Sequence, residues 1–283
     1  MTIQEAYRIG LAQLTPVYGS GEADAILKIL LPFVTGMEKA DMIRTPDQPL
    51  TTTILTEWNM RIEQLLRQVP IQYITGKTIF CGLELTVDPS VLIPRPETEE
   101  LVLMASNWLA NHPQARVLDI GTGSGCIPIS LKKMHPSVFV RAIDRESNAL
   151  ELARKNATDQ KTPIDFFLLD FLNQTNWPRL GAFDLLISNP PYIPISEKTT
   201  LPQNVVEHEP AAALFVPDDD PLVFYEAIAA FGKTSLSAGG IILLECHEQY
   251  ADDVARTFGE AGYESRVIID LFDRARFVRA CFL

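Results

Sequence analysis

Apolar residues recur at helical spacing through the first part of the chain. Residues 3–14 carry them at roughly every third or fourth position, and residues 25–30 repeat the pattern. The stripe is strongest over residues 51–69, and Pro70 ends it. This region contains no glycine-rich or metal-binding motif, so we expect residues 1–70 to form a small helical domain without chemistry of its own.

The pattern changes over residues 71–95. Two short runs, residues 73–76 and 79–87, are β-type and punctuated by glycine, which predicts a hairpin. A further helix is expected from the proline-rich segment at 94–99 through about Ala110. We therefore expect residues 71–95 to be a β-hairpin linker between two domains.

Strands and helices alternate over residues 96–283. The expected strands are nearly continuous apolar runs, as in sheets covered on both faces. They are residues 115–120, 138–143, 164–169, 183–188, 240–245, 265–269 and 275–282. The expected helices between them are residues 125–134, 147–157, 221–234 and 249–261. This order predicts an α/β domain with a doubly wound, mostly parallel, seven-stranded sheet.

Composition and charge narrow the functional classes. The 283 residues suit one large domain and one smaller one, and 47% of them are hydrophobic. A formal charge of −12 disfavours a protein that grips nucleic acid through its phosphates. The four cysteines form no CxxC pair, which indicates reduced thiols, and no apolar run has the length of a membrane span. We expect a cytoplasmic protein without contact to a membrane.

A glycine loop follows the first strand of the larger domain and leads directly into a helix. Its residues are Gly121, Thr122, Gly123, Ser124 and Gly125. Glycines permit a tight turn and let a ligand approach the main chain closely. The spacing lacks one residue of the dinucleotide-binding fingerprint, and the loop lacks the lysine of a P-loop. An ordinary tight turn between strand and helix is the structural alternative.

Two further strand ends carry acidic or aromatic residues. Asp144 ends the second strand and can accept hydrogen bonds from two ribose hydroxyls, although it could also cap the helix beginning near Ser147. Asp170 and Phe171 end the third strand, where they can hold and stack an adenine, although Phe171 also suits the core. In order with the glycine loop, these groups predict S-adenosylmethionine as the cofactor.

The fourth strand runs into Asn189, Pro190, Pro191 and Tyr192. Two consecutive prolines end the hydrogen-bond ladder and fix a rigid turn, which leaves the Pro190 carbonyl without a ladder partner. Rigidity suits a catalytic acceptor, which must be in place before the reaction. A turn with a purely structural role is the alternative.

These residue types suit methyl transfer to a planar nitrogen. An amide or aniline nitrogen is a poor nucleophile because its lone pair is delocalised. The Asn189 side-chain oxygen and the Pro190 carbonyl can each accept one N–H and so aim the lone pair at a methyl group. Tyr192 can pack on the planar group near the sulfonium charge. We predict Asn189, Pro190 and Tyr192 as catalytic residues, and Asn189 to Tyr192 as the substrate site.

The motif and the glycine loop resemble those of amino-methyltransferases that act on planar nitrogens, including adenine-N6 DNA enzymes. Three more segments, residues 70–76, 92–99 and 209–214, narrow the resemblance to the HemK family of release factor glutamine methyltransferases. The resemblance spans nearly the whole chain and is loosest over the first seventy residues.

The resemblance implies a class I S-adenosylmethionine-dependent methyltransferase fold in residues 96–283. It implies that residues 1–70 help to hold a peptide chain release factor, whose Gly-Gly-Gln loop enters the active site. The glutamine would be methylated on its side-chain amide nitrogen, which modulates translation termination. By position, residues 121–125, Asp144 and Phe171 would bind the cofactor. Asp170 and Asn189 complete our predicted cofactor contacts.

The chain departs from the family pattern at three places. Phe171 stands where the family has tryptophan, residues 215–220 replace a glycine-containing stretch, and Glu245-Cys246-His247 replaces Glu-Ile-Gly. Neither Cys246-His247 nor Glu207-His208-Glu209 has a standard zinc spacing, so we expect no metal. Methylation of adenine in nucleic acid and a non-catalytic cofactor-binding module stay open as alternatives. Acidic charge opposes the first, and the intact asparagine motif opposes the second. We expect a monomer.

Overall fold

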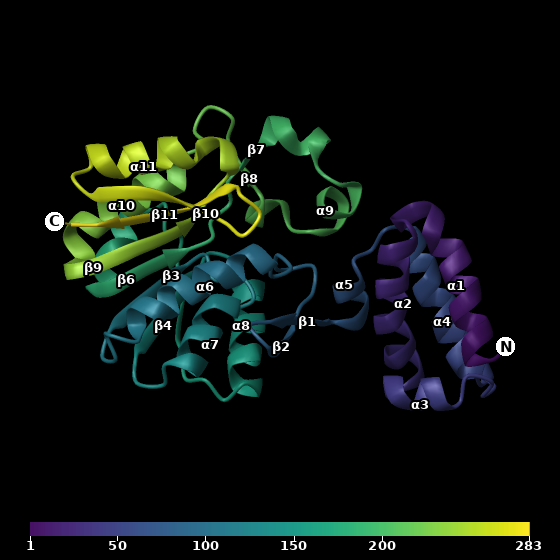
Figure 1. The fold of residues 1–283 in the computed structure, drawn as a ribbon. Helices are drawn as coiled ribbons and strands as arrows, with labels where there is room; N and C mark the ends of the chain where they lie inside the picture. Colours follow the sequence, from purple (N-terminus) through teal and green to yellow (C-terminus); the bar gives the residue numbers. More distant parts are fainter. Residues whose placement is uncertain (283) are drawn as a thin grey trace. The chain divides into compact units, whose positions relative to one another are not determined.

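The structure, a computed structural model, describes residues 1–282 and divides into two compact units. The first unit comprises Met1–Lys77 together with Pro202–His208. The second unit comprises the rest of the described chain (Figure 1). The division after Lys77 falls within the segment 71–95.

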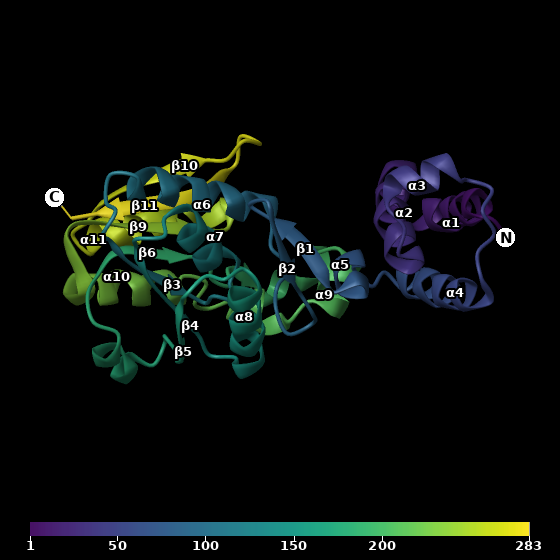
Figure 2. The same ribbon diagram turned by 90° about the horizontal axis from the view of Figure 1, so that it is seen from below.

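The first unit is a helical bundle around one apolar core. Thr2 and Glu5 form a capping box that fixes the start of the first helix. Trp58 is buried at the centre, and a Cβ on Gly10 would lie 2.8 Å from its ring, so the glycine permits the close approach of these helices. The helices, seen from a second direction in Figure 2, are α1 (Ile3–Tyr18), α2 (Ser20–Thr35), α3 (Lys39–Arg44), α4 (Thr52–Leu66), α5 (Ile71–Thr75) and α9 (Gln203–His208).

Two expectations for this unit are corrected. Helix α4 ends at Leu66 and not at Val69, because Gln68 adopts a left-handed conformation (φ 59°) and the Val69 N–H turns back to the Gln64 carbonyl. The first run of the expected hairpin is a helical turn, α5. Such short apolar runs are ambiguous in sequence, and here burial of Ile71 and Ile74, three residues apart, selects the helix.

The hairpin itself forms from the second run. Strands β1 (Lys77–Phe80) and β2 (Leu83–Thr86) make a two-stranded sheet. Cys81 and Gly82 connect them, both at positive φ (47° and 75°), as a two-residue turn of this hand requires.

The second unit contains the expected seven-stranded sheet. Its order is β10-β11-β9-β6-β3-β4-β5, in which β11 runs in the opposite direction to the other six strands. The order reverses at β3, between β4 and β6, which makes the carboxyl ends of these strands the place where a ligand binds in such folds. The strands are β3 (Arg116–Ile120), β4 (Phe139–Asp144), β5 (Asp165–Leu168), β6 (Phe183–Ser188), β9 (Leu236–Glu245), β10 (Glu264–Ile269) and β11 (Ala275–Cys281).

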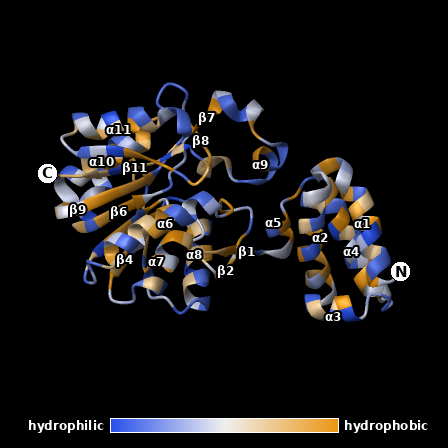
Figure 3. Cartoon of the chain, viewed as in Figure 1, coloured by the Kyte–Doolittle hydropathy of each residue, from blue (hydrophilic) through white to orange (hydrophobic). Residues whose placement is uncertain are grey.

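Helices cover both faces of this sheet, as Figure 1 shows. One apolar cluster packs the helices α6, α7 and α8 against one face, and a second packs α10 and α11 against the other. The buried parts of the central strands, such as residues 185–187 of β6 and 241–244 of β9, are accordingly hydrophobic (Figure 3). These helices are α6 (Pro96–Leu109), α7 (Cys126–Met134), α8 (Ser147–Asp159), α10 (Val223–Ser235) and α11 (Ala251–Glu260).

A long segment, the excursion, connects β6 to α10 and comprises residues 189–222. It contains β7 (Ile193–Pro194) and β8 (Phe215–Val216), which pair in parallel. The sequence pattern did not indicate this small sheet, because two-residue strands carry no periodicity. Within residues 1–282, no helix has both the length and the apolar character needed to cross a membrane.

Candidate functional site

A cavity opens at the carboxyl ends of the parallel strands in the second unit. It is lined by the ends of β3, β4 and β6, by the segment before α6 and by residues 210–213 of the excursion. Of the predicted site residues, the cavity is lined by Gly121, Thr122, Gly123, Ser124, Asp144, Asp170, Phe171, Asn189, Pro190 and Pro191. Gly125 and Tyr192 are outside this lining.

The glycine loop is held open by its backbone conformation. Gly121, Gly123 and Gly125 all have positive φ (75°, 53° and 80°). A Cβ on Gly121 or Gly123 would meet no atom within 4 Å, so both face open space, whereas one on Gly125 would lie 3.0 Å from Ile129. Gly125 therefore serves the packing of α7, and the first two glycines shape the cavity wall.

Asp144 ties the loop to the next strand end. Its Oδ2 accepts the N–H of Gly123 at 2.8 Å, and its Oδ1 accepts the N–H of Glu146 at 2.9 Å. Burial raises the pKa of Asp144, and the two N–H donors oppose that shift. No side-chain hydrogen bond caps α8, so Asp144 is not a helix cap. Each carboxylate oxygen keeps a second lone pair for a ligand hydroxyl.

Asp170 and Phe171 occupy the cavity wall beyond β5. The Asp170 carboxylate is exposed and accepts the N–H of Leu172 at 3.1 Å. Phe171 is buried and packs edge-on against Phe231, so it belongs to the core while also lining the cavity. The structure thus confirms a core position for Phe171, and its stacking on an adenine stays a prediction.

Asn189 and Pro190 lie where β6 ends. The Asn189 Nδ2 donates to the Thr98 hydroxyl at 2.9 Å, which leaves the Asn189 Oδ1 as the free acceptor of that amide. Within residues 1–282, no hydrogen bond to this oxygen or to the Pro190 carbonyl is present. The Asn189 side-chain oxygen and the Pro190 carbonyl thus belong to consecutive residues that both line the cavity. A carbonyl without a ladder partner is what two consecutive prolines predict.

Tyr192 turns away from the cavity lining and toward β9. Its hydroxyl donates to Glu245 Oε1 at 3.3 Å, and its ring packs edge-on against His247. Burial and the nearby Glu245 charge raise the pKa of the Tyr192 phenol well above its usual range. Tyr192 is thus held by its hydroxyl at the end of β9, and its packing on the substrate amide stays a prediction.

The cavity has the donors and acceptors that S-adenosylmethionine requires. Among residues 1–282, the buried hydroxyls of Thr122 and Ser124, which line the cavity, have no hydrogen-bond partner. Unpaired buried polar groups are costly, and a ligand rich in hydroxyl and amine groups would satisfy these two hydroxyls. The carboxylate of Asp119 is also buried and unpaired but does not line the cavity, and burial raises its pKa to about 7. The residues present fit this cofactor.

The cavity lining carries charges of both signs: Asp144, Glu146 and Asp170 are acidic, and Arg95 and Arg145 are basic. The acidic groups can interact with the positive ammonium and sulfonium groups of S-adenosylmethionine. In the described part of the chain, no group of three or more His, Cys, Asp or Glu residues is arranged to hold a metal ion.

Several site residues were missed by the sequence reasoning. Thr98 lines the cavity, and Arg95 forms an ion pair with Glu209, whose other carboxylate oxygen accepts the N–H of Ile93 at 3.2 Å. These contacts hold the segment before α6 against the excursion. The sequence did contain one signal. Glu245 follows the apolar run 241–244 at the end of a strand, and a glutamate buried in such a position usually has a polar partner.

Comparisons with known proteins follow the same division of the chain. Residues 101–213 match the family model of the methyltransferase small domain, and residues 5–76 match that of the PrmC N-terminal domain. Two solved structures resemble the fold. The catalytic domain of hMettl16, in complex with MAT2A 3′UTR hairpin 1, has a TM-score of 0.53 and 16% identity, covering 71% of this chain and 75% of that one. The 16S rRNA N2 G1207 methyltransferase of T. thermophilus, in complex with AdoMet and guanosine, has a TM-score of 0.51 and 17% identity, covering 73% and 50%.

The structural likeness confirms the expected class I methyltransferase fold, and sequence relatives carry the comparison further. A release factor glutamine methyltransferase of Bacteroides thetaiotaomicron is 39% identical over 269 residues, covering 94% of this chain and 95% of that protein. One of Flavobacterium psychrophilum is 35% identical over 281 residues, covering 98% of both. Since this identity extends over nearly the full length of both proteins and includes the helical unit, the chain belongs to the release factor glutamine methyltransferase family.

Proposed function

We propose that this protein transfers a methyl group from S-adenosylmethionine to the side-chain amide nitrogen of the glutamine in a release factor's Gly-Gly-Gln motif. The observation that carries the proposal is the pair of oxygen acceptors at the end of β6. The nitrogen of the Asn189 side-chain amide donates to Thr98, so the amide oxygen is available to the substrate. The Pro190 carbonyl supplies the second acceptor.

The two acceptors perform the chemical task that a glutamine amide poses. When bound, S-adenosylmethionine supplies an electrophilic methyl group on its sulfonium. Asn189 Oδ1 and the Pro190 carbonyl each accept one N–H of the substrate amide, which fixes the nitrogen and weakens delocalisation of its lone pair. Both acceptors are in place beforehand, so little reorganisation is needed as positive charge develops on the nitrogen.

The rest of the cavity divides between substrate and cofactor. Pro191 extends the rigid cavity wall beside the substrate amide. Tyr192 would pack on the planar substrate group, and its hydroxyl donates to Glu245. Residues 121–124 would hold the cofactor through their main chain and hydroxyls, Asp144 would accept its ribose hydroxyls, and Phe171 would pack on its adenine, beside Asp170.

We further propose that the helical unit docks the release factor and that the protein acts as a monomer without binding nucleic acid directly. The net charge of −12 opposes a phosphate-binding surface. The helical unit lacks chemistry of its own but matches a domain model named for this family, which supports a role in recognition.

The test is replacement of Asn189 by alanine, with methyl transfer from labelled cofactor measured separately on release factor, DNA and RNA. We expect label on the release factor glutamine alone. The variant should lose on the order of 10²-fold in rate, the usual cost of one preorganised polar contact. Its affinity for S-adenosylmethionine should stay close to that of the unaltered protein. Loss of cofactor affinity equal to the loss of rate would contradict the assignment, as would label on nucleic acid.

A further inference from the structure

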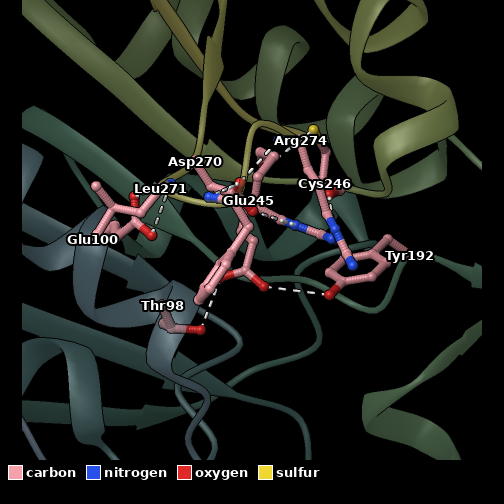
Figure 4. A network of polar contacts seen from close by, with 10 residues as sticks. Thr98, Glu100, Tyr192, Glu245, Cys246, Asp270, Leu271 and Arg274 are labelled. Atoms are coloured by element: carbon pink, nitrogen blue, oxygen red, sulfur yellow. Dashed lines mark hydrogen bonds and ion pairs between the residues drawn. The ribbon is translucent and has the colours of Figure 1, made fainter.

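Glu245 lies behind the substrate site, at the end of β9, and is 1% exposed. Its Oε2 accepts the hydroxyl of Thr98 at 2.8 Å, and its Oε1 accepts the hydroxyl of Tyr192 at 3.3 Å. Figure 4 shows Thr98 and Tyr192 on either side of the carboxylate. Three elements of the second unit, α6, β9 and the turn after β6, thus meet at one buried acid.

The ionised carboxylate determines the direction of every hydrogen bond in this network. A carboxylate can only accept, so the single hydroxyl proton of Thr98 is directed at Glu245. The Thr98 oxygen is then available to Asn189 only as an acceptor, and the Asn189 amide must present its nitrogen to it, at 2.9 Å. The Asn189 Oδ1 is therefore turned toward the cavity.

We infer that Thr98 and Glu245 are positioning residues for methyl transfer: Glu245 orients Thr98, and Thr98 orients the Asn189 amide so that its oxygen meets the substrate. This inference rests on the proposed role of Asn189. Without the network, the amide could rotate by half a turn, because its oxygen and nitrogen ends have nearly the same shape. The rotated amide presents two N–H groups to the N–H groups of the substrate and cannot hold it.

The network also makes the orientation dependent on protonation. Burial raises the pKa of Glu245 to about 7, against the hydrogen bonds of Thr98 and Tyr192 and the charge of Arg276. A protonated Glu245 can donate to Thr98, which frees the Thr98 proton for the Asn189 oxygen and favours the rotated amide. The productive orientation is then present above the pKa and is lost as the pH falls through it. The other ionisable groups that face Glu245 are Glu97, Tyr225, Cys246 and, from β11, Arg276.

The experiment compares Thr98→Val, Thr98→Ser and Glu245→Gln with Asn189→Ala in the full-length protein, on intact release factor. Thr98→Val should lower kcat about tenfold or more, with the Kd for S-adenosylmethionine and the KM for release factor changed less than about twofold. Thr98→Ser retains the hydroxyl and should restore most of the rate. Adding Asn189→Ala to Thr98→Val should cost less than it does alone, because both act through one contact.

A pH profile of kcat separates positioning from mere structural support. In the unaltered protein kcat should fall below a pH of about 7, the pKa of Glu245. Glu245→Gln should flatten this acidic limb, because residue 245 then has no carboxylate whose protonation could reverse the direction of the hydrogen bonds. This variant also tests the inference if Thr98→Val proves unstable. Thr162→Val is the matched control, since Thr162 is also a buried threonine and its hydroxyl donates outside the network, to the Ala157 carbonyl at 3.2 Å. It should leave kcat and the profile unchanged.

The outcomes distinguish the inference from the function on which it rests. An unaltered kcat in Thr98→Val, with Asn189→Ala impaired, would overturn the positioning role and leave the proposed site intact. A fully active Asn189→Ala would overturn both. An acidic limb that persists unchanged in Glu245→Gln would refute the role of Glu245 specifically.

Discussion

Alanine replacements at Gly121 and Gly125 should affect different properties of the protein, although both residues belong to one loop. Both have a left-handed backbone, with φ of 75° and 80°. A methyl group on Gly125 would lie 3.0 Å from Ile129 and 3.1 Å from Ala153, whereas one on Gly121 would meet nothing within 4 Å. Only Gly121 lines the cavity. Gly125→Ala should therefore lose mainly stability, and Gly121→Ala should lose mainly cofactor affinity.

The magnitudes follow from two separate costs. A left-handed conformation costs a residue with a Cβ about 1–2 kcal/mol. Forcing a methyl group into a packed interior adds about 1–3 kcal/mol. Gly125→Ala should thus be destabilised by about 2–5 kcal/mol and Gly121→Ala by about 1–2 kcal/mol. For a unit of this size each kcal/mol lowers the melting temperature by about 2–4 °C.

Thermal melting without ligand and calorimetric titration with S-adenosylmethionine measure the two effects. Gly181→Ala supplies the backbone cost alone, because Gly181 has φ 84°, has no neighbour within 4 Å of its Cβ and is not part of the cavity wall. Gly125→Ala should melt well below Gly181→Ala yet bind cofactor normally while folded. Equal melting of these two variants would refute the packing argument. Unchanged affinity in Gly121→Ala would show that the loop does not contact the cofactor.

Two other predictions concern cofactor and protein substrate. Asp144→Ala should weaken S-adenosylmethionine binding by about 1.5–3 kcal/mol, the contribution of a hydrogen bond to a charged group; calorimetry measures this, and an unchanged Kd would leave Asp144 as a clamp for Gly123 and Glu146 only. Deleting residues 1–70 should preserve cofactor binding and methylation of a short glutamine peptide at high concentration, while kcat/KM on intact release factor falls sharply. A soluble truncation with undiminished kcat/KM on the intact factor would refute the docking role.

Most of the fold follows from periodicity. The apolar runs predicted the seven strands of the large sheet, and the helical stripes predicted α1, α4 and the helices that flank the sheet. Prediction failed where elements are short. Residues 71–75 form one helical turn because Ile71 and Ile74 bury together, and five residues are too few for a period to distinguish a turn of helix from a strand.

The candidate site was predictable where its residues lie at the ends of apolar strands. The glycine loop, Asp144 and Asn189 each follow an apolar strand, and parallel strands bring their carboxyl ends to one edge. Tyr192 was predicted to pack its ring on the planar substrate group, and this stays a prediction. The hydrogen bond from its hydroxyl to Glu245 was not predicted, because no local pattern indicates the direction of a side chain after two prolines.

The hydrogen bond between Thr98 and Glu245 joins residues that are 147 positions apart, and it depends on which strands are neighbours. Strand β9 follows β6 after a long excursion yet pairs with it in parallel, with Ser188 beside Leu244. The residue after each of these, Asn189 and Glu245, therefore emerges at the same edge, and Thr98 in α6 bridges them. A sequence pattern specifies that a strand exists and which residue ends it, but it does not specify its neighbour. The hydrogen bonds that link Glu245 to Asn189 through Thr98 could thus be identified only once the order of the sheet was known.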